Sequence, residues 1–410
     1  MSSDWVETVF SDLCVITRGA SPRPIHDWMT EGDGIPWVKI SDATATNSRF
    51  IGKTSGKIKK DGASRSVEVF QGDLILSNSA TPGIPRFMGI NACIHDGWLL
   101  LRDFRGATKE YLYYLLEADR PKLVAQGNGS VFTNLKTDIL KNHRVHLPPL
   151  QEQKAIAHIL GTLDDKIELN RKTNETLEAM AKALFKSWFV DFDPVRAKAE
   201  GRPTGLPAEI SDLFPDSFED SELGEIPSGW EVGGLEEFLV LQRGFDLPAP
   251  QRIKGAYPVV AASGVSGNHN EPMAFAPGVV TGRSGVLGKV FYIQTDFFPL
   301  NTTLWAKEFR LATPIYGYFL LCDIDFAVFN AGSAVPTLNR NHLGSLRFPL
   351  PPKALVVSFT EVAVDLMKRK EGIVAETSNL STTRDALLPK LISGEIRIPD
   401  AEKMLEEVGI

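Results

Sequence analysis

The sequence has few cysteines and no long apolar run. Cys14, Cys93 and Cys322 are its only three cysteines, and they lie far apart among 410 residues without forming a CxxC pair. This usage is typical of a reducing compartment and argues against a disulfide framework or a cysteine-rich zinc site. No stretch approaches the roughly 20 apolar residues that cross a bilayer, and the first residues do not form a signal peptide. We therefore expect a cytoplasmic protein without a membrane partner.

Several catalytic signatures are also missing. The Pro-Pro pairs at 148–149 and 351–352 lack the neighbours of the Asn/Asp-Pro-Pro-Tyr/Phe loop that holds an amino group for methylation, and there is no GxxxxGK[ST] phosphate loop. Gly127-Asn128-Gly129 indicates a tight loop rather than a dinucleotide site. His143 and His146 have a spacing that can bind metal, but a strand-like segment needs none. We expect no catalytic residue, no metal and no cofactor bound by this chain.

The net charge of −7 is distributed unevenly. Residues 1–150 carry 18 Lys and Arg against 16 Asp and Glu, and residues 226–352 carry 9 of each, whereas residues 151–225 carry 9 against 16. The remaining residues, 353–410, carry 8 against 10. Phosphate contact favours a basic surface, so neither near-neutral segment predicts strong nucleic-acid binding by itself.

The chain repeats itself in two halves. Trp5 and Arg18-Gly19 recur 225 residues later as Trp230 and Arg243-Gly244. The matches that follow keep their order: Gly72–Leu76 with Gly278–Thr281 at a displacement of 206, Tyr111–Leu116 with Tyr316–Leu321, and Gly129-Ser130, Arg144 and Leu147–Pro149 with Gly332-Ser333, Arg347 and Leu350–Pro352 at 203. Preserved order with falling displacement indicates a duplicated unit whose second copy has shorter loops.

Each half begins with a β-rich part. Runs such as Ile35–Ile40 and Trp98–Leu101, divided by Gly, Pro, Asn and Asp, predict strands. A short helix is predicted around 108–118 and again around 313–321. A Pro-Pro pair, which suits the residues before a helix, ends each β-rich part.

Heptad spacing follows each Pro-Pro pair. The positions are Ile156, Leu163, Asn170, Leu177 and Leu184 in the first half, and Phe359, Leu366, Ile373, Leu380 and Leu387 in the second. This spacing predicts two long helices paired as a coiled coil, with a long helix on a domain surface as the alternative. We expect Trp188 and Phe189, near the end of the first helix, to be core residues.

Roughly 35 residues of helix span about 50 Å. Antiparallel pairing would therefore separate two β-rich domains by a distance on the scale of one DNA turn, about 34 Å, with pseudo-two-fold symmetry. The expected fold is α+β: two mixed α/β domains joined by an antiparallel coiled coil. A spacer of fixed length between two recognition domains predicts a split recognition site, in which the bases between the two half-sites are not read.

Several segments together resemble the specificity subunits of type I restriction-modification systems: Leu147–Gln153, Leu163–Ile167, Leu184–Pro194, Leu213–Phe218, Gly224–Trp230 and Leu388–Ile396. Lys353-Ala354-Leu355 departs from the family's usual Gln-Glu-Gln type of run. The resemblance implies target-recognition domains at 1–150 and 226–352, a central conserved helix at 151–195, a linker at 196–225, and a distal conserved helix with tail at 353–410.

The resemblance also implies partners and a role. Double-stranded DNA would be read as an asymmetric bipartite site, and modification subunits would dock on the helices and methylate adenine N6 with S-adenosylmethionine. Restriction subunits would join through the modification subunits, with ATP and Mg²⁺ used by these partners. The complex would defend against foreign DNA, and the chain itself would not be catalytic.

Base reading requires hydrogen-bond donors and acceptors in loops beside strands. The candidates in the first half are Arg18, Ser21, Arg23, Lys39, Ser77, Asn78, Ser79, Thr81, Arg86, Asn128, Ser130, Asn134 and Lys136. Those in the second half are Arg243, Thr281, Arg283, Ser284, Lys289, Ser333, Thr337, Asn339 and Arg340. Each of them could instead cap a turn or be solvated.

Two other functions compete with this interpretation. A nuclease fused to a recognition domain would need a catalytic domain, whereas the two halves use nearly all of the chain. A protein-binding repeat scaffold would not explain why the polar loops differ between halves while the helices keep their pattern.

Overall fold

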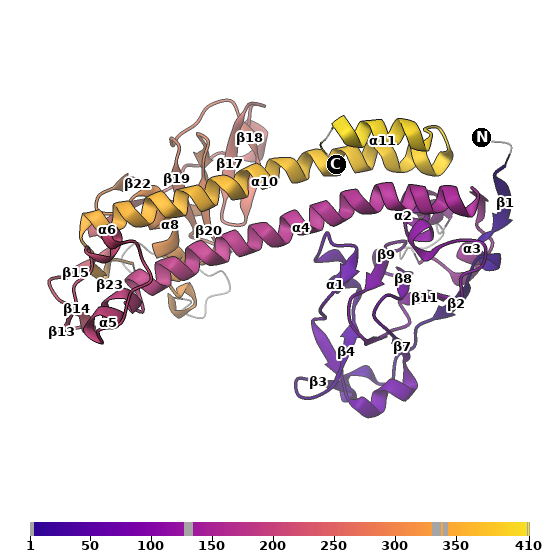
Figure 1. Cartoon of the computed structure of the whole chain (residues 1–410), viewed down its shortest axis with the longest axis horizontal. Helices are drawn as coiled ribbons and strands as arrows, with labels where there is room; N and C mark the ends of the chain where they lie inside the picture. Colours follow the sequence, from indigo (N-terminus) through magenta and orange to yellow (C-terminus); the bar gives the residue numbers. More distant parts are fainter. Residues whose placement is uncertain (1–3, 127–133, 330–337, 339–342, 408, 410) are drawn as a thin grey trace. The chain divides into compact units, whose positions relative to one another are not determined.

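The computed structural model describes residues 4–126, 134–329, 338, 343–407 and 409. The chain divides into two compact units, one formed by Met1–Lys172 with Ile373–Ile410 and the other by Thr173–Gly372. Each unit contains a β-rich domain and part of each of two long helices, α4 (Leu150–Phe189) and α10 (Lys353–Ser393) (Figure 1). The predicted α+β class is confirmed.

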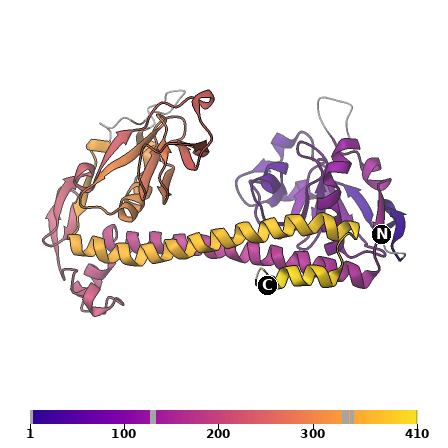
Figure 2. The same ribbon diagram turned by 90° about the horizontal axis from the view of Figure 1, so that it is seen from above.

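In the first unit α4 and α10 lie side by side and run antiparallel (Figure 2). Arg384 donates to Asp164 at 2.8 Å, and further along α4, Asn170 donates to Glu376 at 2.9 Å, so rising numbers on α4 meet falling numbers on α10. Asn170 is only 4% exposed. The heptad positions buried here are Ile156, Leu163, Leu380 and Leu387, while Ile373 is half-buried.

The helix pair of the second unit has the same antiparallel sense. Lys370 pairs with Glu178 at 2.6 Å, and the rings of Phe185 and Phe359 lie 5.6 Å apart. Phe359 is buried, and the remaining heptad positions are half-buried: Leu177, Leu184 and Leu366. Trp188 and Phe189 lie in the hydrophobic core of this unit.

Both long helices begin where the sequence predicts, directly after a Pro-Pro pair. The Pro149 carbonyl accepts from the backbone of Gln153 at 3.0 Å, and the Pro352 carbonyl accepts from that of Leu355 at 3.0 Å. Proline lacks an N–H group, so it is tolerated before and within a first helical turn, where such groups have no intrahelical partner.

The β-rich domain of the first unit contains two five-stranded sheets, ordered β2-β11-β8-β9-β5 and β3-β6-β4-β10-β7, and a separate pair, β1-β12. The strands are β1 (Val6–Val9), β2 (Val15–Arg18), β3 (Met29–Thr30), β4 (Ile35–Val38), β5 (Phe50–Ile51), β6 (Gly56–Ile58), β7 (Val67–Val69), β8 (Leu74–Ser77), β9 (Pro85–Met88), β10 (Ala92–Ile94), β11 (Trp98–Arg102) and β12 (Arg144–Leu147). The helices are α1 (Ile40–Thr44), α2 (Lys109–Gln126) and α3 (Thr137–Lys141).

Alternation along β8 explains how this domain is layered. Leu74 and Leu76 join the core formed with α2 and the long helices, whereas Ile75 joins a second core that contains Val38 and Ile94 of the other sheet. Successive side chains of a strand point to opposite faces, and both faces of β8 are covered. This is why β8 is apolar throughout, with its four residues all buried.

The second unit repeats this arrangement with shorter sheets, ordered β16-β22-β19-β20 and β18-β17-β21, and with the pairs β15-β23 and β13-β14. The strands are β13 (Phe218–Ser221), β14 (Gly224–Pro227), β15 (Glu231–Gly234), β16 (Leu239–Arg243), β17 (Tyr257–Ala261), β18 (Gly264–His269), β19 (Gly278–Gly282), β20 (Val290–Ile293), β21 (Phe298–Pro299), β22 (Thr303–Phe309) and β23 (Arg347–Leu350). The helices are α5 (Asp193–Ala199), α6 (Ala208–Ser211), α7 (Leu235–Phe238) and α8 (Pro314–Asp323).

Strand register corrects one alignment made from the sequence. Leu76 pairs with Leu99, and Thr281 pairs with Leu304, so β19 is displaced from β8 by 205 residues and not by 206. A shift of one residue would turn every side chain of the strand to the opposite face. The sequence alignment matched Gly72 with Gly278 and so gave the wrong register. Both faces of this strand are apolar, so no alternation of polar and apolar residues distinguishes the two registers.

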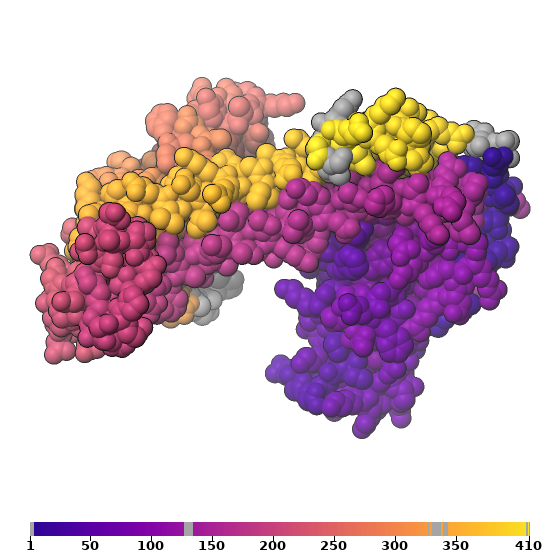
Figure 3. All heavy atoms as spheres, viewed as in Figure 1, coloured from indigo at the N-terminus to yellow at the C-terminus, as the bar shows by residue number. Residues whose placement is uncertain are grey.

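The segment predicted as a linker, 196–225, folds into α6 and a β-hairpin in the second unit. Phe214 of this segment is buried against Trp188, with ring centroids 5.4 Å apart. At the chain's other end, α11 (Ile398–Glu407) folds back beside the helix pair of the first unit and covers it (Figure 3). Within the described part of the chain, no helix is long and apolar enough to cross a membrane.

Candidate nucleic-acid interface

Four predicted DNA-contact residues of the first unit converge on one turn. This turn joins β10 to β11 and contains Asp96. The Asp96 carboxylate accepts from Ser21 Oγ at 2.6 Å and from Arg23 Nη2 at 3.4 Å. Its backbone carbonyl accepts from Arg18 Nε at 3.1 Å and from Asn78 Nδ2 at 3.2 Å. We call these five residues the Asp96 cluster.

The electrostatics of the Asp96 cluster favour an ionised carboxylate. The hydrogen bond from Ser21 and the charge of Arg23 hold the pKa of Asp96 below its usual range, although partial burial opposes them. Two arginines against one carboxylate leave one net positive charge. Arg18 is exposed, and the Arg23 side chain is 72% exposed, so both guanidinium groups are accessible from solvent.

Further predicted residues border the Asp96 cluster. Lys39 lines the same surface cleft as Ser21 and Arg23, together with Trp37 and His95. A side chain at Gly97, in the same turn, would come within 2.5 Å of Ser79 Oγ. The backbone of Leu135 donates to the Asn78 carbonyl at 2.8 Å, which brings the exposed residues Asn134 and Lys136 to this end of the domain.

The second unit has a corresponding cluster around Asn301, in the turn between β21 and β22. Asn301 Nδ2 donates to the Asp246 carboxylate, and Arg283 Nη1 donates to the Asn301 carbonyl at 3.5 Å. Arg243 ends β16 and lines one cleft with Asp246 and Arg283. We call these four residues the Asn301 cluster. Its two arginines and one carboxylate again leave one net positive charge.

A glycine follows the strand-ending arginine in each cluster because the chain passes very close to the neighbouring turn. A side chain on Gly19 would place its Cβ 2.1 Å from the His95 carbonyl oxygen, and one on Gly244 would place it 2.2 Å from that of Leu300. Real Cβ atoms do not approach so closely. The repeated Arg-Gly pair therefore has a steric reason that is common to both units.

The remaining predicted residues of the second unit lie close by. Ser284 and Arg283 both donate backbone N–H groups to the Thr302 carbonyl, at 3.1 and 2.8 Å. Lys289 is exposed, donates to the Ser263 carbonyl at 2.9 Å, and lies 5.4 Å from the Phe291 ring centre. Six predicted residues lie outside the described residues: Asn128, Ser130, Ser333, Thr337, Asn339 and Arg340.

Three predicted residues have structural roles instead. Ser77 is fully buried, and its hydroxyl donates to the Thr81 carbonyl at 2.6 Å, which shapes the loop that contains Thr81. Thr281 is fully buried within β19, so neither hydroxyl is on the surface. Arg86 is only 12% exposed and pairs with Glu117 of α2 at 3.2 Å, away from the Asp96 turn. The many hydrogen-bond donors at residues 77–86 could not indicate that the side chain of Ser77 is buried and that of Arg86 largely so.

Sequence reasoning missed Asp96, Asp246 and Asn301, the acceptor side of both clusters. The predicted residues are cationic or neutral, and they do not include a carboxylate. The available signal was a polar residue two positions before the start of a strand: Asp96 precedes Trp98, and Asn301 precedes Thr303. An aspartate can hold an arginine in position and can also accept from cytosine N4.

The arrangement offers chemistry suited to base edges. Arginine pairs with guanine O6 and N7, asparagine with the adenine amino group and N7, and aspartate with cytosine N4. Both clusters place such groups in short turns held by β-sheet hydrogen bonds. A rigid scaffold with side chains fixed at its edge is the usual basis of sequence reading.

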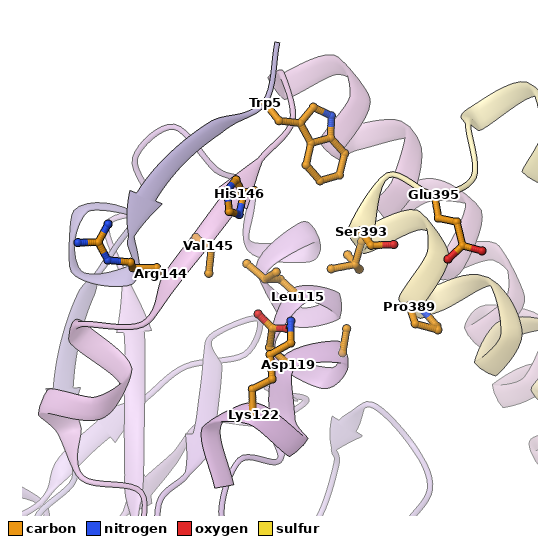
Figure 4. A pocket seen from close by; sticks show the side chains of 12 residues that line it. Trp5, Leu115, Asp119, Lys122, Arg144, Val145, His146, Pro389, Ser393 and Glu395 are labelled. Carbon is orange, nitrogen blue, oxygen red and sulfur yellow. The ribbon is translucent and has the colours of Figure 1, made fainter. Parts of the chain in front are cut away.

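A separate cavity of about 480 Å³ lies in the first unit at the end of the helix pair. Figure 4 shows Trp5 beside β1, Leu115 and Asp119 on α2, and Pro389 and Ser393 on α10 around it. None of the predicted DNA-contact residues lines this cavity. Ile392 lines it, at the position where the second unit has the larger Phe189, whose ring packs 6.4 Å from Trp230.

Among the described residues, no group of three or more His, Cys, Asp or Glu side chains is placed to hold a metal ion. His143 is buried, and its Nε2 lies 2.9 Å from the Asp119 carboxylate. His146 is exposed on the opposite face of β12. The two histidines therefore do not converge.

A family model described as the type I restriction modification DNA specificity domain matches residues 2–179, which include the Asp96 cluster and most of α4. Residues 2–179 of the chain are thus similar to a DNA specificity domain of type I restriction-modification systems. The Asn301 cluster lies outside this match.

Two curated specificity subunits are similar to this chain over nearly its whole length. The chain is 25% identical to the type I restriction enzyme MjaIX specificity subunit of Methanocaldococcus jannaschii, covering 97% of this chain and 94% of that protein. It is 24% identical to the HindI specificity subunit of Haemophilus influenzae, covering 96% and 100%. The crystal structure of a type I S subunit from M. genitalium has the same fold, with a TM-score of 0.60 at 17% identity over 95% of this chain and 97% of that one.

Proposed function

We propose that this specificity subunit reads an asymmetric bipartite DNA site, one half with the Asp96 cluster and the other with the Asn301 cluster. The observation that carries the proposal is the pair of chemically unlike clusters at equivalent turns of one repeated scaffold. Two identical clusters on a repeated scaffold would fit a palindromic site, whereas the Asp96 and Asn301 clusters differ in the residues that face solvent. Phosphate contacts from Lys39, Lys136 and Lys289 would set the register on the duplex.

The helix pair supplies the spacing between the half-sites in this proposal. Modification subunits would dock along α4 and α10, and restriction subunits would join through them. The partners would supply adenine N6 methylation with S-adenosylmethionine and, for translocation and cleavage, ATP and Mg²⁺. The specificity subunit contributes positioning and no chemical step. Because each cluster carries only one net positive charge, stable DNA binding would need basic surfaces from the partners.

The decisive experiment is methyl transfer to a random DNA library, with the chain alone and with its co-expressed modification subunit. A split motif that appears only with the partner supports the proposal and gives both half-sites. Methylation or cutting by the chain alone would instead support the competing function of a self-contained enzyme. Absence of both activity and DNA retention in the complex would favour the protein-binding scaffold.

A domain exchange separates the reading role from the spacing role. Replacing residues 1–150 with the first domain of another family member should change one half-site and leave the other intact. Shortening α4 and α10 by one matched turn each should alter only the unread spacer. A change in both half-sites after the first exchange would contradict the assignment of one half-site to each domain.

A further inference from the structure

The two clusters can be compared position by position because strand register aligns them. Arg18 pairs with Leu99, and Arg243 pairs with Leu304. Ser77 pairs with Trp98, and Gly282 pairs with Thr303. The next residues are therefore equivalent, which matches Asn78 with Arg283. The backbone confirms this match, because Leu135 donates to the Asn78 carbonyl and Leu338 donates to that of Arg283, each at 2.8 Å.

The same register matches Asp96 with Asn301, each two residues before the aligned Trp98 and Thr303. Ser21 matches Asp246, each three residues after the strand-ending arginine. Both pairs are hydrogen-bonded across the same gap between loop and turn. In the first unit the loop donates, from Ser21 Oγ to the Asp96 carboxylate, whereas in the second unit the turn donates, from Asn301 Nδ2 to the Asp246 carboxylate. The carboxylate has changed sides while the hydrogen bond has been kept.

The move of the carboxylate from the turn to the loop leaves the net charge of the cluster unchanged. Each cluster has two arginines and one carboxylate, so the exchange does not alter the cluster's own contribution to the attraction for phosphate. The two clusters differ in the position of the carboxylate, which is on the turn in the first unit and on the loop in the second. They also differ in the arginine that donates to the turn carbonyl. Any functional consequence of the exchange must therefore concern geometry and base choice rather than general affinity.

The two clusters also hold different cations. In the first unit Arg23 from the loop pairs with the Asp96 carboxylate, and Arg18 Nε donates to the Asp96 backbone carbonyl. Within the described ranges the Arg18 side chain has no other hydrogen bond, so its terminal nitrogens remain for a ligand. In the second unit Arg283 donates to the turn carbonyl instead, and the Arg243 side chain makes no hydrogen bond to any described residue.

We propose that the loop–turn pair, Ser21–Asp96 in the first unit and Asp246–Asn301 in the second, selects the base that each unit reads. In the first unit the Asp96 turn holds Arg18 through its backbone carbonyl and Arg23 through its carboxylate, and it presents Arg18 for bidentate contact with a guanine of the first half-site. In the second unit the carboxylate is on the loop, at Asp246, and it offers a hydrogen-bond acceptor for a base amino group. This inference rests on the proposed function, because it requires that the clusters face base edges.

The test is the charge-conserving exchange S21D/D96N, which gives the first unit the second unit's arrangement. The holo complex with the modification subunit is assayed for methylation of a random library, beside the wild-type complex. We expect discrimination at one or two positions of the first half-site to fall by about tenfold or to change base, because one good bidentate contact discriminates by that order. The second half-site and the spacer should stay unchanged, and they report that the variant is folded and assembled.

Two matched variants complete the design. Arg105→Gln removes an exposed arginine just beyond β11, at the end of that strand opposite Asp96, and should leave both half-sites unchanged. Arg18→Gln keeps Ser21 and Asp96 but removes the guanidinium, so preference should move away from guanine at one position. If S21D/D96N abolishes all methylation, Arg18→Gln and the mirror exchange D246S/N301D in the second unit decide the question.

The possible failures are distinguishable. A wild-type complex that yields no split motif would overturn the proposed function itself. A wild-type split motif that S21D/D96N leaves unchanged, with the second half-site intact, would overturn only the inference and make the pair a scaffold contact. An unchanged motif in both Arg18→Gln and D246S/N301D would lead to the same conclusion.

Discussion

The Arg384 guanidinium donates to the Asp164 carboxylate at 2.8 Å and ties the two long helices together in the first unit. Asp164 is only 9% exposed and also accepts from the Tyr114 hydroxyl at 2.8 Å. Burial opposes ionisation of Arg384, but Asp164 and Asp385 outweigh it and raise its pKa. At the equivalent positions of the second unit, 203 residues away, the helices pack Ala181 against the core that contains Met367.

Breaking this ion pair on one side should be more harmful than replacing both members. We expect Arg384→Ala to lower the free energy of unfolding by about 2 kcal/mol, because it leaves a largely buried carboxylate without its cation. The double variant D164M/R384A, which copies the second unit, should lose less. Thermal and urea unfolding of the three proteins would measure this. A double variant less stable than Arg384→Ala would contradict the expectation.

Gly19→Ala should disturb reading by the first unit. Its Cβ would lie 2.1 Å from the His95 carbonyl oxygen, so the turn that holds Asp96 must move. We expect a loss of stability of about 2 kcal/mol or more, as for a severe steric clash, and weaker discrimination in one half-site only. Gly52→Ala is the control, because no atom lies within 4 Å of its added Cβ. Equal effects of the two substitutions would refute the steric argument.

Gly372→Ala should stabilise the protein. Gly372 is exposed within α10, and an added Cβ would meet no atom within 4 Å. Alanine in a helix interior is more favourable than glycine by about 0.5–1 kcal/mol. A rise in the thermal unfolding midpoint would show this. Gly394→Ala should do the opposite, because Gly394 has φ +72° and lies close to the Trp5 ring.

Ile392→Phe should place a larger apolar side chain against the cavity shown in Figure 4 and fill a small part of it. The second unit has Phe189 at the equivalent position, packed near Trp230, and the first unit has Trp5 there. Filling a cavity of this kind commonly adds about 0.5–2 kcal/mol of stability. Unfolding midpoints would test this, with unchanged methylation specificity as the control readout. A lower midpoint would mean that the cavity walls cannot accept the ring.

Acid should weaken the first unit through Asp119. Burial tends to raise the pKa of this carboxyl, but hydrogen bonds from His143 and Lys122 outweigh it and hold the pKa below its usual range. A lowered pKa contributes stability that is complete above the unfolded value of about 3.9 and is lost as pH falls through the folded value. Asp119→Asn should therefore be destabilising at pH 7, and the difference from wild type should shrink below pH 4.

Unfolding midpoints at pH 7 and pH 3.5 would measure this change. Glu31→Gln, at an exposed position, serves as the control and should show no such pH dependence. A difference between Asp119→Asn and wild type that is the same at both pH values would argue against the ionised pair.

Periodicity and repetition made most of the fold predictable. Each long helix is marked by a Pro-Pro pair at its start and by seven-residue spacing, from Ile156 to Leu184 and from Phe359 to Leu387, and these signals depend only on local sequence. The Arg-Gly pairs at 18–19 and 243–244 marked the ends of two equivalent strands. In both units the chain passes too close to the neighbouring turn for any residue but glycine. The β8–β19 alignment was wrong by one residue, since a strand buried on both faces has no alternation to fix its register.

The sequence by itself determined the duplicated architecture, the starts of the two long helices and the family resemblance, because these follow from spacing, order and motif. Only the tertiary structure decided which polar residues meet. Asp96 and Ser21 are 75 positions apart, and Asn301 and Asp246 are 55 apart, so their pairing depends on sheet register rather than on neighbouring residues. Burial likewise separated Ser77, Thr281 and Arg86 from the exposed donors, because burial is a property of the packed layers that a polar loop composition does not encode.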